Sequence, residues 1–61
     1  MQKYQVIEAR VKRAELYTKM SVDTLYRARN QWLEMQDSGM AIDRVAIQQI
    51  NAELKRRGED V

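Results

Sequence analysis

Apolar residues recur along the first half of the chain at alternating spacings of three and four. The series begins at Tyr4 and ends at Met35, and only Thr18 and Ser21 interrupt its apolar character. Such a repeat is typical of a long α-helix whose apolar stripe is covered by other helices. It predicts one helix over about residues 3–37, roughly 50 Å long. The stripe consists of Tyr4, Ile7, Val11, Ala14, Thr18, Ser21, Leu25, Ala28, Trp32 and Met35.

Ser21 allows a second interpretation of the same segment. Serine is a strong N-cap residue, so a new helix can begin after it and divide the first helix into two. The stripe nevertheless passes through Ser21 without losing phase. For this reason we favour a continuous helix.

A turn is expected at residues 38–43. Gly39 can adopt the left-handed conformation that closes a helix, and Asp43 is a suitable N-cap for the next one. A second helix is predicted over about residues 44–57, followed by a frayed end at residues 59–61. Its apolar side contains Val45, Ile47, Ile50 and Leu54.

These elements predict an all-α fold, with the long helix and the shorter antiparallel helix forming a helical hairpin in a single domain, residues 1–61. The second helix, roughly 21 Å long, can cover only half of the first. A second copy of the chain is the expected cover, so that two hairpins form a helical bundle. The predicted homodimer interface is Tyr4, Ile7, Val11, Ala14, Thr18, Ser21, Leu25, Ala28 and Trp32.

The stripe also bears on the orientation of the dimer. Antiparallel pairing about the middle of the stripe sets larger residues against alanines, such as Val11 against Ala28. Parallel pairing instead matches opposite charges, such as Arg10 with Glu15 of the other copy. We favour the antiparallel arrangement, and both stay open. The two polar positions at mid-stripe either set register and orientation or are a tolerated pair whose hydroxyls bond back to carbonyls one turn earlier, and both interpretations stay open.

The composition limits the kinds of catalytic and metal sites that the chain can form. The 61 residues contain no cysteine and no histidine, so disulfides, thiolate metal sites and the commonest general base are absent. Oligomerisation is the remaining way to stabilise so small a chain. We predict no enzymatic activity, no metal or other cofactor, and no small-molecule substrate.

Basic residues form two clusters on the predicted helices. With 11 basic and 9 acidic residues the net charge is only +2, which is modest for a nucleic-acid-binding protein. Glu8 and Glu15 also interleave with the first cluster, which favours a solvated helix face. Binding to a phosphate backbone is the alternative interpretation. Its candidate contacts are Arg10, Lys12, Arg13, Lys55, Arg56 and Arg57.

Other sequence features bear on location. No apolar run approaches the roughly 20 residues that span a bilayer, and the N-terminus lacks a signal-peptide core. Because the chain begins with Met1, we expect it to be a complete reading frame. The lack of cysteine fits a reducing compartment, so we expect a cytoplasmic protein without membrane contact.

The hairpin with a polar layer at mid-stripe, and the ending Glu53-Leu54-Lys55-Arg56-Arg57-Gly58-Glu59-Asp60, carry a family resemblance. The chain resembles the Rop-like dimeric bundles that bind RNA in plasmid copy control, and the small accessory early-region proteins of lambdoid phages. No functional residue is carried over, since the chain has no phenylalanine to match the Rop RNA-binding face. The phage likeness implies a small regulatory role in a bacterial cytoplasm. We therefore expect a homodimeric regulatory or adaptor protein that contacts another protein, with nucleic-acid binding as the alternative.

Overall fold

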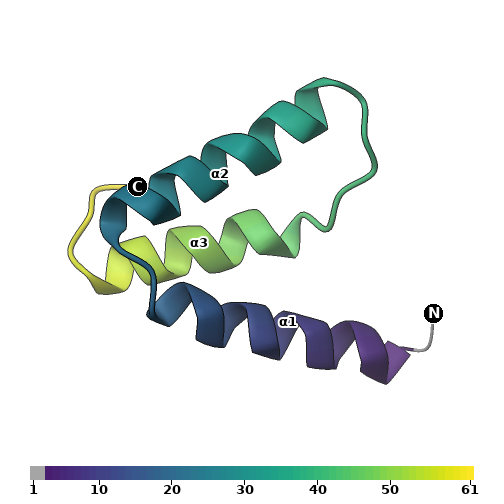
Figure 1. Cartoon of the computed structure of the whole chain (residues 1–61), viewed down its shortest axis with the longest axis horizontal. Coiled ribbons are helices and arrows are strands. Elements are labelled where there is room, and N and C mark those ends of the chain that lie inside the picture. The colour runs from purple at the N-terminus through teal and green to yellow at the C-terminus, as the bar shows by residue number, and fades with distance from the viewer. Residues whose placement is uncertain (1–2) are drawn as a thin grey trace.

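The computed structural model describes residues 3–61, with side chains from Gln5 onward. Within that range the chain forms three helices and no strand: α1 spans Lys3–Thr18, α2 spans Val22–Asp37 and α3 spans Val45–Arg56. The prediction of an all-α fold is confirmed. α2 runs opposite to α1 and α3, and α3 packs against both of the other helices (Figure 1).

The prediction of one helix across residues 3–37 is wrong. The chain leaves the helix after Thr18 and begins a new one at Val22, so residues 19–21 form a turn. The alternative interpretation, a new helix capped by Ser21, is the one observed. A single chain therefore supplies three packed helices where we expected a hairpin of two.

Local hydrogen bonds explain why a new helix begins at this point. Ser21 is extended, with φ −68° and ψ 161°, and its Oγ accepts a hydrogen bond from the backbone N–H of Thr24 at 3.2 Å. This bond satisfies one of the free N–H groups at the start of α2. The heptad phase does not reveal the break, because a capping serine and a serine in a polar layer can occupy the same position.

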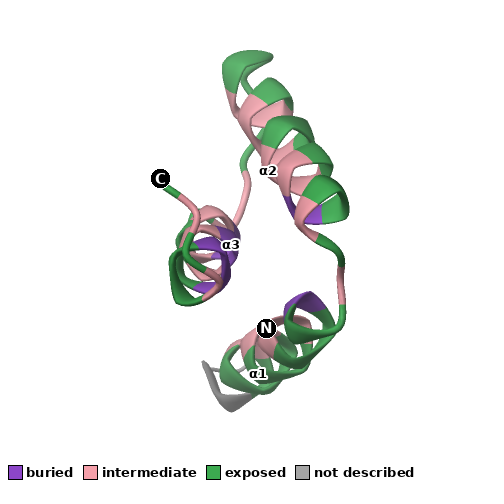
Figure 2. Ribbon diagram, turned by 90° about the vertical axis from the view of Figure 1, so that its left-hand side faces the viewer, coloured by how far each residue is buried: buried purple, intermediate pink, exposed green. Residues whose placement is uncertain are grey.

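The apolar core lies at the end of the bundle where the turn at residues 19–21 meets the last turns of α3. Its most buried members are Tyr17, Leu25, Ile50 and Leu54. Figure 2 shows the buried residues on the sides of the helices that face one another. Trp32 packs beside this cluster and donates from Nε1 to Tyr17 Oη at 3.2 Å. The turn is what allows one chain to bury both Tyr17 and Leu25 against α3.

Glycines end the two later helices. Gly39 and Gly58 have φ values of 88° and 87°, a left-handed conformation that other residues rarely adopt. In each case the residue after the glycine donates its N–H to the carbonyl five residues back, at 3.1 and 2.9 Å. The chain can therefore reverse after α2 and turn back toward the core after α3.

The last residues are packed rather than frayed, contrary to expectation. Glu59 accepts a hydrogen bond from Tyr26 Oη at 3.0 Å, and Val61 packs against the apolar core. The Tyr26–Glu59 bond joins the tail to α2, and Figure 1 shows the C-terminus at the end of the bundle where α2 begins. The tail thus adds cover to the end of the bundle that already holds the core.

Candidate functional site

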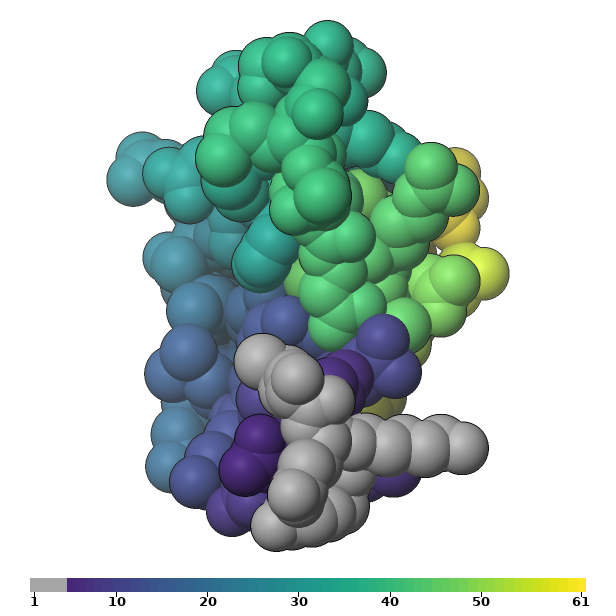
Figure 3. All heavy atoms as spheres, turned by 90° about the vertical axis from the view of Figure 1, so that its right-hand side faces the viewer, coloured from purple at the N-terminus to yellow at the C-terminus, as the bar shows by residue number. Residues whose placement is uncertain are grey.

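Two arginines of α1 bind one carboxylate at the start of α3. Arg10 donates from Nε and Nη2 to the two oxygens of Asp43 at 3.0 and 2.9 Å, and Arg13 donates from Nη2 at 2.6 Å. Gln49 accepts from Arg13 at 2.8 Å and donates to the Arg10 carbonyl at 2.7 Å. We call these four residues the polar clasp. Figure 3 shows this end of the molecule, where the chain around the start of α3 (green) lies on the first half of α1 (purple).

The clasp keeps Asp43 charged. Hydrogen bonds from Arg10 and then Arg13 hold the pKa of Asp43 well below its usual range, and the backbone N–H of Val45 acts in the same direction. Burial opposes these bonds. The Asp43 side chain is still 28% exposed, so water weakens each ion pair. The N-cap of α3 is Arg44 rather than the predicted Asp43, and it makes no side-chain capping bond. Asp43 accepts the N–H of Val45 and ties α1 to the start of α3.

A second carboxylate, Glu53, lies near the other end of α3. Its side chain is only 7% exposed, and it accepts hydrogen bonds from Arg56 and Arg57. These bonds, with Arg56 the larger cause, lower the pKa of Glu53 to about 2. A carboxylate so far from water requires such partners, because an unpaired buried charge is costly.

Arg57 also binds the end of α1. Its Nη2 donates to the carbonyls of Tyr17 and Thr18 at 3.1 and 3.0 Å. The last carbonyls of a helix lack the usual partner four residues on, so outside donors stabilise them. Glu53 holds the guanidinium that performs this capping.

Most of the candidate nucleic-acid contacts form ion pairs with carboxylates of the same chain. The six residues are Arg10, Lys12, Arg13, Lys55, Arg56 and Arg57. The four arginines bind the carboxylates of Asp43 or Glu53. The Nζ atom of Lys12 lies 3.4 Å from Oε1 of Glu8. Lys55 is exposed on α3. Binding to nucleic acid stays a prediction.

The α2 part of the predicted dimer interface faces inward. Leu25 is fully buried, and Ala28 and Trp32 pack against the core of the same chain. Thr18 and Ser21 are exposed at the turn. Their hydroxyls bond locally, to the Glu15 carbonyl at 2.6 Å and to the Thr24 N–H respectively.

The α1 part of that interface faces outward. Ile7 and Val11 are 52% and 53% exposed, and we call this pair the outer stripe. Ala14 continues it at the next turn and is partly buried. The side chain of Tyr4 lies outside the described residues. Dimerisation itself stays a prediction.

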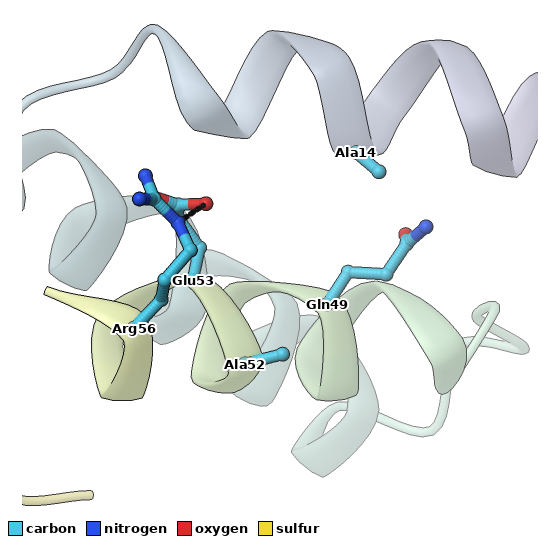
Figure 4. Close-up of a pocket in the computed structure, with 5 residues that line it drawn as sticks. All are labelled: Ala14, Gln49, Ala52, Glu53 and Arg56. Atoms are coloured by element: carbon cyan, nitrogen blue, oxygen red, sulfur yellow. Dashed lines mark hydrogen bonds and ion pairs between the residues drawn. The ribbon is translucent and has the colours of Figure 1, made fainter.

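Beside the outer stripe, α1 and α3 form a groove of about 220 Å³. Its lining consists of Ala14, Gln49, Ala52, Glu53 and Arg56. Figure 4 shows Ala14 pointing from α1 toward α3, Gln49 reaching back toward α1, and the Glu53–Arg56 pair further along α3. Ala14, one turn on from Val11, thus lines a groove whose other lining side chains all come from α3.

Sequence reasoning missed Asp43, Gln49 and Glu53 as partners of the arginines. Glu53 had a usable signal, since it precedes Arg56 and Arg57 by three and four residues in a predicted helix. No sequence signal pointed to Asp43 as a partner, because it lies 33 residues from Arg10 along the chain. Only the turn at residues 19–21 brings the two together.

No protein-family model, no curated protein and no solved structure matches this chain. The resemblance to phage early-region proteins and Rop-like bundles therefore stays a prediction. Among residues 3–61, no helix is long and apolar enough to cross a membrane. A fold alone does not imply a function, so any function of this chain depends on the surface chemistry of the candidate site.

Proposed function

We propose that this chain is a non-enzymatic regulatory or adaptor protein that acts through protein–protein contacts. Its first partner is a second copy of the chain, which contacts the outer stripe of α1. The proposal places the dimer in the cytoplasm, in a bacterial host cell if the chain is phage-encoded.

The outer stripe carries this proposal. Ile7 and Val11 lie one turn apart and are both more than half exposed, beside a groove with alanines on each side. Burial of an aliphatic side chain of this size contributes about 1.5–3 kcal/mol. Exposed apolar residues that lie together favour a contact surface, whereas single ones need no explanation.

The ion pairs support a protein partner over nucleic acid. Arg10 and Arg13 would have to leave Asp43 before either could bind a phosphate, and Arg57 would have to leave Glu53. Two carboxylates thus compete with any phosphate for these arginines. An apolar contact on the outer stripe requires no such exchange.

Two matched variants test the contact surface. Val11→Gln should weaken a dimer, because two-fold symmetry removes the apolar group from both copies, with an expected rise in Kd of about a hundredfold. Leu16→Gln is the control: Leu16 is 54% exposed but lies about 140° around α1 from Val11. Sedimentation over a concentration series measures both. A folded monomer at all concentrations, or equal effects of the two variants, contradicts the proposal.

A mobility-shift assay in low salt tests the alternative. With the four arginines engaged by carboxylates, we expect no retardation of DNA or RNA at micromolar protein. Binding that falls steeply with added salt would instead show contacts with phosphates. That outcome would replace the adaptor proposal with the nucleic-acid one.

A further inference from the structure

We propose that the turn at residues 19–21 can straighten and that two copies of the chain then exchange α1. In the exchanged dimer, residues 3–37 form one helix in each chain, and the α1 half packs on α3 of the other copy. The exchange uses the inward face of α1. It does not rest on the contact proposed above, which uses the outer stripe.

The turn is compatible with a helix. It consists of Lys19, Met20 and Ser21, and the chain has no proline. Among the described residues, positive φ occurs only at the two glycines. The residues of the turn therefore all have negative φ values, as residues of a right-handed helix do. Ser21 also follows Thr18 by three residues and precedes Leu25 by four. A straightened segment would therefore continue the apolar stripe in phase.

Hydrogen bonds hold the bent form at the turn itself. They are the Ser21 cap on Thr24, the bonds from the Lys19 and Met20 N–H groups to the carbonyls of Leu16 and Tyr17, and the bonds from Arg57 to the carbonyls of Tyr17 and Thr18. In a continuous helix, these carbonyls would instead accept the N–H groups four residues further on. Arg57 would keep its ion pair with Glu53. Straightening thus replaces bonds rather than leaving polar groups without partners.

The contacts of α1 can all re-form between copies. The polar clasp joins α1 to α3, and Tyr17 packs against Ile50 and Leu54. When α1 separates from α3, the core residues that it covered become exposed to water. The α1 of a second copy can cover them with the same contacts. Exchange of an identical element in this way is a route to dimers that needs no new surface.

A proline at the start of α2 should block the exchange. Val22 is the first residue of α2, where proline is favoured, and the extended Ser21 before it has the ψ that proline prefers. In a continuous helix the same proline would lose a backbone hydrogen bond and clash with the preceding turn. Val22→Pro should therefore reduce exchanged dimer about a hundredfold or more. Val22→Ala is the control for lost packing of Val22 on the core, and equal effects of the two variants overturn the proposal.

A mixing experiment identifies the exchange directly. Arg10→Glu places like charges across the clasp in one chain, and Asp43→Arg does so in another, so each protein alone should be destabilised. After unfolding and refolding together, exchange sets the α1 of each chain against an opposite charge on α3 of the other. Native mass spectrometry should then show heterodimer in excess over both homodimers. Heterodimer at or below the statistical proportion overturns the proposal.

The two proposals fail separately. A dimer lost in Val11→Gln but unaffected by Val22→Pro supports the outer-stripe contact and overturns the exchange. The reverse pattern supports the exchange and overturns that contact. A protein that is monomeric at every concentration, before and after refolding at millimolar concentration, overturns both.

Discussion

The two ends of the helical bundle are held together by different chemistry. At the turn end, Tyr17, Leu25, Ile50 and Leu54 form an apolar core, and a polar contact, the Glu53–Arg57 pair, lies beside it. At the other end, α1 meets α3 through the polar clasp, with Asp43 at its centre. Apolar burial has no direction and responds little to pH, whereas ion pairs respond to both salt and pH. We therefore expect one end to set the stability and the other to adjust it.

The largest expected effect comes from the apolar end. Leu54 is fully buried, and Leu54→Ala should lower the free energy of unfolding by about 2–5 kcal/mol. Leu16→Ala is the control, because Leu16 is 54% exposed and does not belong to the core. Urea unfolding followed by circular dichroism measures both. A loss in Leu54→Ala no larger than that in Leu16→Ala would show that this core does not determine stability.

The same comparison shows what the sequence can predict. Helix content and the ends at Gly39 and Gly58 follow from periodicity and local backbone preference, and they appear in the structure as described above. The turn at Ser21 does not, because the heptad pattern and the capping preference of serine oppose each other there. The contacts that decide between them lie far along the chain, where Arg57 binds the end of α1.

The candidate site was predictable only in part for the same reason. The basic residues of α1 stand out in the sequence, but Asp43 lies 30 residues beyond Arg13. A straight helix would carry these arginines away from α3, so the wrong prediction of the helix concealed their partner. The exposure of Ile7 and Val11 was expected because the second helix of a hairpin would be too short to reach them. In the structure α3 packs against α1 as well as α2, so the two residues are exposed for another reason: they lie on a side of α1 that is not covered.

Acid should weaken the clasp and the Glu53 pair before it affects the core. The pKa of Glu53 falls from 4.5 to about 2, so its contribution is complete above pH 4.5 and is lost as pH falls toward 2. Asp43, whose pKa is also lowered, acts in the same direction. Urea unfolding at pH values from 7 to 2 should show stability declining below about pH 5. Glu53→Gln should flatten that decline, and an unchanged slope in this variant contradicts the assignment.

A smaller effect is expected from the clasp alone at neutral pH. Asp43→Asn leaves Arg10 and Arg13 without a carboxylate and should cost about 1 kcal/mol, since the group is partly exposed. The difference from the unmodified chain should shrink in high salt, where ion pairs are screened. Leu54→Ala provides the contrast, because its loss should persist in salt. A salt-independent effect of Asp43→Asn would show that the ion pairs are not the cause of the loss, because asparagine keeps the oxygen that accepts the Val45 N–H.

The smallest effect separates two neighbouring arginines that bind the same carboxylate. The Arg56 side chain is 65% exposed, whereas that of Arg57 is 20% exposed and also reaches the Tyr17 and Thr18 carbonyls. Arg57→Ala should cost about 1 kcal/mol, because it removes bonds that join α1 to α3. Arg56→Ala should leave the urea midpoint nearly unchanged, because Glu53 keeps its bond to Arg57 and water screens the exposed pair. Equal losses in the two variants would mean that the Glu53 pair, rather than the capping of α1, holds this end of the bundle together.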